Sequence, residues 1–109
     1  MMRGEIVAVV LPGAYGKPRP ALIVQSDLFD AHPSVSVLSI TSELRDTPLF
    51  RISISPTAEN GLQKTSQIML DKTTTIPREK IGGVIGKAGD AIMQEVDRCL
   101  ALFLGISGQ

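Results

Sequence analysis

Short runs of apolar and β-branched residues, separated by turn-forming residues, recur along most of this chain. The runs occupy residues 5–11, 20–24, 35–40, 51–55, 67–70 and 81–85. In residues 35–40 and 51–55 the apolar residues alternate with polar ones, which is typical of a strand that buries one face. The first run stops at the turn signal Pro12-Gly13, and the paired Gly82-Gly83 favours a bulge in the last run. The pattern therefore predicts a series of short strands.

The C-terminal segment has a different period. From Asp90 onward its apolar residues recur about every 3.6 positions, at Ile92, Met93, Val96, Cys99, Leu100, Phe103 and Leu104. Asp90 is a suitable N-cap and Gly105 a suitable C-terminal stop. A single helical turn is expected around Leu28-Phe29. Together these elements predict a mainly β (α+β) protein, with a small β-barrel or strongly curved sheet and a C-terminal helix.

Length and composition predict one domain over residues 1–109. Hydrophobic residues make up 43% of the chain and charged residues 20%, which allows one modest core and argues against disorder. The N-terminal Met-Met-Arg-Gly-Glu lacks a signal-peptide core, and no apolar run is long enough to span a membrane. We therefore expect a cytoplasmic protein without membrane contacts. The single cysteine, Cys99, is expected to be a buried free thiol.

The charge pattern narrows the classes of ligand. Eleven basic and eleven acidic side chains cancel, so there is no overall positive field that would attract nucleic acid. An anionic ligand would need a local cluster. His32 and Cys99 are too isolated to form a zinc-type site, and residues 82–89 lack the spacing of a phosphate-binding loop. No metal and no cofactor is predicted, and without tryptophan a base-stacking platform is not expected.

Arg19 is the most distinctive candidate for chemistry, because it stands between Pro18 and Pro20 at the predicted start of a strand. Proline fixes φ and restricts the residue before it, so Arg19 has little backbone freedom. A guanidinium held in this way suits phosphate recognition and stabilisation of developing negative charge. The simpler interpretation is a surface arginine between two turn prolines.

Two other polar groups follow predicted strands, where small barrels display functional side chains. Thr41-Ser42 follows residues 35–40, and Asp71-Lys72-Thr73-Thr74-Thr75 follows residues 67–70. If the fold brings them to Arg19, they can bind a phosphodiester and transfer protons. The structural alternatives are a turn capped by Thr41-Ser42, an Asx turn at Asp71 and a solvated Lys72.

The ordered motifs resemble the MazF/PemK (Kid-like) toxins of bacterial toxin–antitoxin systems. The resemblance covers essentially the whole chain and rests on Met2-Arg3-Gly4-Glu5-Ile6-Val7, Arg19-Pro20-Ala21-Leu22-Ile23-Val24, Ile40-Thr41-Ser42, Phe50-Arg51-Ile52, Gly61-Leu62, Asp71-Lys72-Thr73-Thr74-Thr75-Ile76 and the helix from Met93 to Leu104. It implies a small SH3-like β-barrel with a C-terminal helix (CcdB/Kid/MazF-like) that works as a homodimer.

The resemblance also implies an activity and a partner. Toxins of this family are sequence-specific, metal-independent endoribonucleases that cleave single-stranded RNA. The substrate's own 2′-hydroxyl attacks, which gives a 2′,3′-cyclic phosphate and a 5′-hydroxyl end. A cognate antitoxin protein covers the RNA groove and neutralises the toxin.

Three residues correspond to the family's functional positions. Arg19 matches the arginine of the Arg-Pro motif and is expected to stabilise the transition state. Thr41 matches a threonine that hydrogen-bonds the scissile phosphate, and Asp71 matches an aspartate proposed as base in Kid-like members. The side chains expected to contact RNA around them are Lys17, Ser42, Lys72 and Arg78.

Two departures from the Kid-like pattern keep other functions open. Met69 stands where some members have an arginine, and the loop 13–17 lacks the histidine that some members carry. One alternative is therefore a catalytically weak or inactive MazF-like binding module. Another is a CcdB-like poison of DNA gyrase, but that family relies on a Trp-Gly-Ile-type C-terminus and this chain has no tryptophan.

Overall fold

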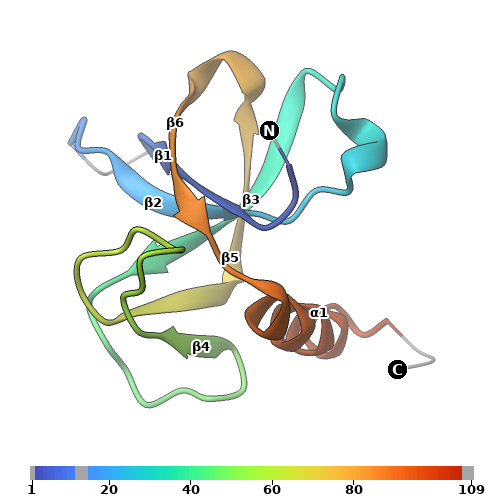
Figure 1. Ribbon diagram of the computed structural model, residues 1–109. Coiled ribbons are helices and arrows are strands. Elements are labelled where there is room, and N and C mark those ends of the chain that lie inside the picture. The colour runs from blue at the N-terminus through green and yellow to red at the C-terminus, as the bar shows by residue number, and fades with distance from the viewer. Residues whose placement is uncertain (1, 12–14, 107–109) are drawn as a thin grey trace.

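The computed structural model describes residues 2–11 and 15–106, which form six strands, two short 3₁₀ turns and one helix (Figure 1). In chain order these are β1 (Glu5–Val9), β2 (Arg19–Ile23), η1 (Asp27–Phe29), β3 (Ser34–Thr41), β4 (Arg51–Ile54), β5 (Ser66–Pro77), η2 (Arg78–Lys80), β6 (Ile81–Lys87) and α1 (Asp90–Leu104). Every predicted strand, the turn at Leu28-Phe29 and the C-terminal helix are confirmed. The predicted Pro12-Gly13 turn lies outside the described residues.

The six strands form one antiparallel sheet in the order β4-β5-β3-β2-β1-β6. Within residues 2–11 and 15–106, β4 and β6 are the edge strands and do not pair with each other, so the sheet curves without closing. The mainly β fold with a C-terminal helix is confirmed, and the term barrel describes it only loosely. The expected irregularity in β6 is present as register shifts against β1.

Strand β5 is longer than the sequence pattern predicts. The predicted run ended at Leu70, but the strand continues to Pro77 because the β-branched Thr73, Thr74 and Thr75 pair with β3. Its register against β3 slips on the way, since Ile40 pairs with Ile68 but Leu38 pairs with Thr73. The extra residues of β5 form a bulge. Asp71 and Lys72 therefore lie in a bulge within a strand, which corrects the expectation that they follow its end.

The sheet buries apolar side chains on both faces. One cluster, which includes Leu38, Ile68 and Leu70, packs against α1 through Val96 and Cys99. The second cluster fills the other face, and its members are Val7, Val9, Ala21, Ile23, Val35, Val37 and Ile76. Since successive strand residues point to opposite faces, β1, β2 and β3 each supply side chains to both clusters. Both faces of β3 are therefore buried, which corrects the expectation that residues 35–40 bury only one face.

The predicted C-terminal stop of α1 at Gly105 is confirmed, but the predicted N-cap at Asp90 is wrong. Gly105 ends the helix in the left-handed conformation at φ 71°, and the Ile106 N–H donates to the Ala101 carbonyl at 2.9 Å. At the other end Gly89 is the N-cap and Asp90 is the first helical residue, without a side-chain capping hydrogen bond. The carboxylate of Asp90 instead lies in the first turn, where it complements the helix dipole.

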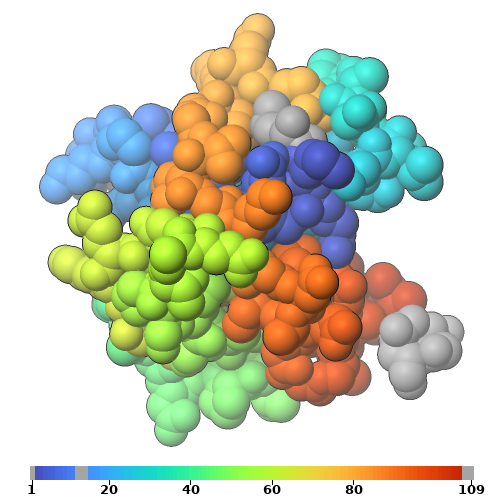
Figure 2. Space-filling model, viewed as in Figure 1, coloured from blue at the N-terminus to red at the C-terminus, as the bar shows by residue number. Residues whose placement is uncertain are grey.

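The loop between β4 and β5 covers part of β6, as Figure 2 shows where the yellow-green segment meets the orange strand. Asn60, 2% exposed, organises this loop: its Oδ1 accepts hydrogen bonds from the N–H groups of Thr57 and Leu62. Gly61 has φ +68°, and a Cβ there would overlap the Ile85 carbonyl oxygen. The loop is thereby held against β6, and its residues after Gly61 are directed towards the groove described next.

Candidate functional site

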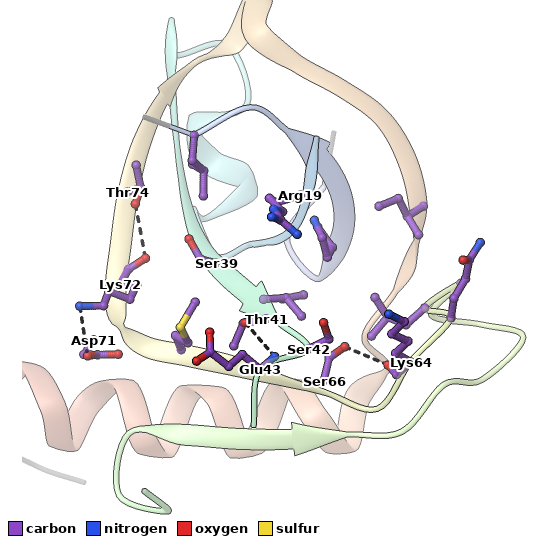
Figure 3. Close-up of a pocket in the computed structure, with 18 of the residues that line it drawn as sticks. Arg19, Ser39, Thr41, Ser42, Glu43, Lys64, Ser66, Asp71, Lys72 and Thr74 are labelled. Atoms are coloured by element: carbon purple, nitrogen blue, oxygen red, sulfur yellow. Dashed lines mark hydrogen bonds and ion pairs between the residues drawn. The ribbon is translucent and has the colours of Figure 1, made fainter. Parts of the chain in front are cut away.

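A groove of about 1130 Å³ opens beside the end of β3, the start of β2 and the bulge of β5 (Figure 3). Its floor continues the face of the sheet that holds the second apolar cluster. Val35 and Val37 of β3 belong to that cluster, whereas Ser39 and Thr41, the next residues on the same face, line the groove. The polar residues of β3 therefore mark where packing ends and the groove begins.

Arg19 lies at the first position of β2, directly after Pro18, where it pairs with Val9 of β1. Its side chain is exposed and lines the groove. Among residues 2–11 and 15–106 its guanidinium has no hydrogen-bond or ion-pair partner, so its five N–H donors are available to a ligand. An anionic ligand in the groove would therefore meet an accessible guanidinium, although the same exposure is also typical of a surface arginine.

Thr41 ends β3, and its Oγ1 accepts a hydrogen bond from the Glu43 N–H at 3.1 Å. The predicted turn cap is thus confirmed. It does not exclude a role in binding, because a threonine hydroxyl that accepts one bond still has a proton to donate. The turn orients the hydroxyl in the groove, with exposed Ser42 and Glu43 beside it (Figure 3).

Asp71 and Lys72 lie at one end of the drawn group and Lys64 at the other, with Arg19, Thr41 and Ser42 between them (Figure 3). Asp71 Oδ2 is 3.7 Å from Lys72 Nζ. Among residues 2–11 and 15–106, Asp71 Oδ1 is buried without a hydrogen-bond partner, so the amides of the threonines that follow do not form the Asx turn considered as an alternative. An unsatisfied carboxylate oxygen is costly and favours a donor from solvent or a ligand.

Two of the predicted RNA contacts lie away from this centre. Exposed Lys17 precedes Arg19 but does not line the groove. Arg78 donates hydrogen bonds to the carbonyls of His32 at 2.7 Å and Phe29 at 3.3 Å. These bonds tie the start of η2 to the segment after β2, so Arg78 has a structural role in this region.

Lys64 is a groove residue that the sequence did not single out. It belongs to the loop that Asn60 and Gly61 hold against β6, and its exposed side chain lines the groove together with Gln63. With Arg19 and Lys72 it gives the groove three cationic side chains against the carboxylates of Glu43 and Asp71. The Asn60-Gly61 turn and the polar residues after it indicate a loop in the sequence, but only its packing on β6 shows that Lys64 is directed towards the groove.

The resolved pKa shifts lie on α1, away from the groove. Arg98 Nη2 is 2.5 Å from Glu95 Oε1, and this contact lowers the pKa of the Glu95 carboxyl. Burial raises the pKa of the Cys99 thiol, which is consistent with the expected buried, unreactive cysteine. Within the described part of the chain, no three His, Cys, Asp or Glu residues are placed to hold a metal ion. No described helix is long and apolar enough to cross a membrane.

Comparison with known proteins identifies the fold and the family. Residues 2–104 match the family described as PemK-like, MazF-like toxin of type II toxin-antitoxin system. A curated relative from Mycolicibacterium smegmatis, named probable endoribonuclease MazF, is 47% identical over 99% of this chain and 100% of its own. Endoribonuclease EndoA of Bacillus subtilis is 25% identical over 95% of this chain and 94% of its own.

A solved structure confirms the architecture. An endoribonuclease in complex with its cognate antitoxin, from a mycobacterial species, superposes with a TM-score of 0.84. The superposition covers 100% of this chain and 99% of the other, at 23% sequence identity. At that identity the likeness establishes the fold alone.

Proposed function

The chain belongs to the PemK-like, MazF-like toxin family of type II toxin–antitoxin systems, and from this premise we propose that it is a sequence-specific endoribonuclease. Its substrate is single-stranded RNA, which it cleaves without a metal ion. The observation that carries the proposal is the unpartnered guanidinium of Arg19 in the same groove as the Thr41 hydroxyl. A cation and a hydroxyl donor together suit a phosphodiester.

The reaction is an attack by the 2′-oxygen of the substrate on the adjacent phosphorus. A base removes the 2′-hydroxyl proton, the bond to the 5′-oxygen breaks, and that oxygen takes up a proton, leaving a 2′,3′-cyclic phosphate. Arg19 stabilises the charge that develops on the phosphoryl oxygens, and Thr41 donates a hydrogen bond to the same phosphate. Asp71 is the proposed base, since it matches the aspartate of Kid-like members and its carboxylate lines the groove.

The groove extends beyond one phosphate, which suits a strand of several nucleotides. Ser42, Lys64 and Lys72 line it and are placed to contact neighbouring phosphates or sugars. Lys17 and Arg78 would contact only the outer parts of a longer RNA. We further propose that a cognate antitoxin neutralises the protein, because its family is that of type II toxin-antitoxin systems and a related structure contains a cognate antitoxin. In this proposal the protein acts as a homodimer in the cytoplasm.

The decisive experiment incubates the protein with a long, mixed-sequence single-stranded RNA in excess EDTA and maps the cut ends. We expect cuts at one short motif that end in cyclic phosphate. Arg19→Ala should lower the rate about 10²-fold or more, as loss of a transition-state charge contact does, without lowering Tm. The control is Lys80→Ala, which removes a cation from η2, outside the groove. Unchanged cutting by Arg19→Ala would remove the role assigned to Arg19.

The weak or inactive binding module is the second candidate, and Met69 is the observation that favours it. Met69 lines the groove at the position where some Kid-like members have an arginine. If the folded dimer binds an antitoxin but cuts no RNA under any of these conditions, this candidate replaces the first. Inhibition of DNA gyrase in a supercoiling assay would instead support the CcdB-like alternative.

A further inference from the structure

Gln67 is a buried polar residue directly beside Thr41. The two residues are cross-strand partners in β5 and β3, so their side chains share the groove face of the sheet. Gln67 is 8% exposed and does not line the groove itself. Its Oε1 accepts a hydrogen bond from the Arg45 N–H at 2.9 Å, and its Nε2 donates to the Arg45 carbonyl, also at 2.9 Å. The amide side chain thus pairs with the backbone of Arg45 as a neighbouring strand would.

Arg51 of β4 extends this contact. Its Nη1 donates to Gln67 Oε1 at 3.0 Å and to the Glu43 carbonyl at 2.9 Å. The side chain is partly buried and also lies outside the groove lining. Gln67 and Arg51 together therefore hold the segment after β3 at Glu43 and at Arg45. We call this arrangement the Gln67–Arg51 clamp.

The clamped segment is the one that orients the Thr41 hydroxyl. Thr41 Oγ1 accepts its hydrogen bond from the Glu43 N–H, and the carbonyl of the same residue is bound by Arg51. Movement of Glu43 would therefore turn the hydroxyl and displace Ser42. The hydrogen bonds of Gln67 to Arg45 and Arg51 are partly buried, so releasing one of them leaves its partner poorly satisfied, whereas the bond from Arg51 to the Glu43 carbonyl is exposed.

We propose that Gln67 and Arg51 are positioning residues for RNA cleavage: the clamp sets the geometry of Thr41 and Ser42 at the scissile phosphate. This inference rests on the proposed function. Neither residue contacts the substrate, so the clamp should affect the rate of the chemical step more than the binding of RNA. A displacement of the order of 1 Å at a reacting group can cost about 10²-fold in rate.

The test compares Gln67→Leu, Arg51→Lys and the control Gln94→Leu, which makes the same change at an exposed position of α1. We would measure kcat and KM for RNA cleavage, the affinity for a 2′-O-methyl RNA that cannot react, and hydrogen exchange of the Arg45 amide. Gln67→Leu should lower kcat about tenfold or more, with KM and analogue affinity changed less than about threefold. Exchange at Arg45 should accelerate about tenfold, since its acceptor is gone.

Arg51→Lys keeps the charge but cannot reach Gln67 and Glu43 together, so it should show a smaller fall in kcat of the same kind. This variant decides the question if Gln67→Leu fails to fold. An unchanged kcat, a change confined to KM, unaltered Arg45 exchange, or an equal loss in Gln94→Leu would each overturn the inference. If the unmodified protein cuts no RNA, the proposed function is wrong, and so is the proposed effect of the clamp on cleavage. Exchange at Arg45 would then decide whether the clamp exists.

Discussion

The two halves of the sheet face that carries the second apolar cluster differ in their side chains: one half packs in the core and the other lines the groove. In the first half Val35 and Val37 of β3 pack in the second apolar cluster, with Val37 fully buried. In the second half Ser39 and Thr41 of the same strand line the groove. All four residues belong to one continuous strand and share one face of it. The groove begins where these side chains change from apolar to hydroxyl and where the register of β5 against β3 shifts.

The largest expected effect comes from placing the same charge in each half. Val37→Asp buries a carboxylate without a partner and should lower the free energy of unfolding by about 3–5 kcal/mol, a large part of the roughly 5–15 kcal/mol of a typical domain. Ser42→Asp adds its charge at the exposed edge of the groove and should change stability by less than about 0.5 kcal/mol. It should still slow cleavage through repulsion of RNA phosphates. Urea denaturation followed by circular dichroism measures the contrast, and equal destabilisation would refute it.

Exchanges between threonine and valine, which have nearly the same shape, test whether each half of β3 affects cleavage or stability. Thr41→Val removes the hydroxyl from the groove and should lower cleavage by about 10- to 10²-fold, with a stability loss of about 1 kcal/mol for the hydrogen bond to Glu43. Val37→Thr introduces a buried hydroxyl and should cost about 1–3 kcal/mol. Because folded Val37→Thr keeps the groove intact, its kcat should equal that of the parent. A large fall in its kcat would mean that the two halves are coupled.

A smaller effect is expected from the cations that line only the groove half. Lys64→Ala should weaken RNA binding and reduce the slope of log affinity against log salt by about 0.7, the value for one contact with a single strand. Titrations of an unreactive RNA at several salt concentrations measure the slope. Lys80→Ala should leave it unchanged. Equal slopes for Lys64→Ala and the parent would place the RNA elsewhere.

The smallest expected effect is at Cys99 of α1, which packs against the opposite face of the sheet. Burial raises the pKa of its thiol, so at pH 8 it should react with Ellman's reagent far more slowly than an unfolded thiol. Groove substitutions such as Ser42→Asp should not change that rate, whereas Val37→Thr should raise it through more frequent opening. Faster reaction in the groove variants would show that the groove half supports the core after all.

Local periodicity accounts for what could be predicted. The alternation in β4 correctly separated buried Ile52 and Ile54 from Ser53, and the helical spacing placed Val96 and Cys99 on the buried side of α1. The same alternation in β3 predicted one buried face and was wrong, because β3 contributes side chains to both apolar clusters. Arg19 and Thr41 were also located correctly, at the start and the end of strands. These features follow from the neighbours of each residue in the chain, so a single sequence contains them.

The features that could not be predicted from the sequence depend on contacts between distant segments of the chain. The threonines after Asp71 read as a loop, but pairing with β3 makes them a strand and places the carboxylate in a bulge. Arg78 stays a predicted RNA contact, but only the structure shows that its guanidinium also binds the carbonyls of His32 and Phe29. The hydrogen bonds of the Gln67 side chain could not be predicted from the sequence, because its partner Arg45 belongs to a different segment of the chain.

Local sequence patterns were sufficient to predict the order of the elements, most of the buried apolar residues, the arginine and threonine that line the groove, and the family. The open sheet, the position of Lys64 in the groove and the hydrogen bonds of Gln67 and Arg51 became evident from the tertiary structure alone. The physical reason is that side-chain periodicity is a local property of the chain. The register between strands and the direction of a loop depend on which distant segments can bury their apolar surface and satisfy their hydrogen bonds together.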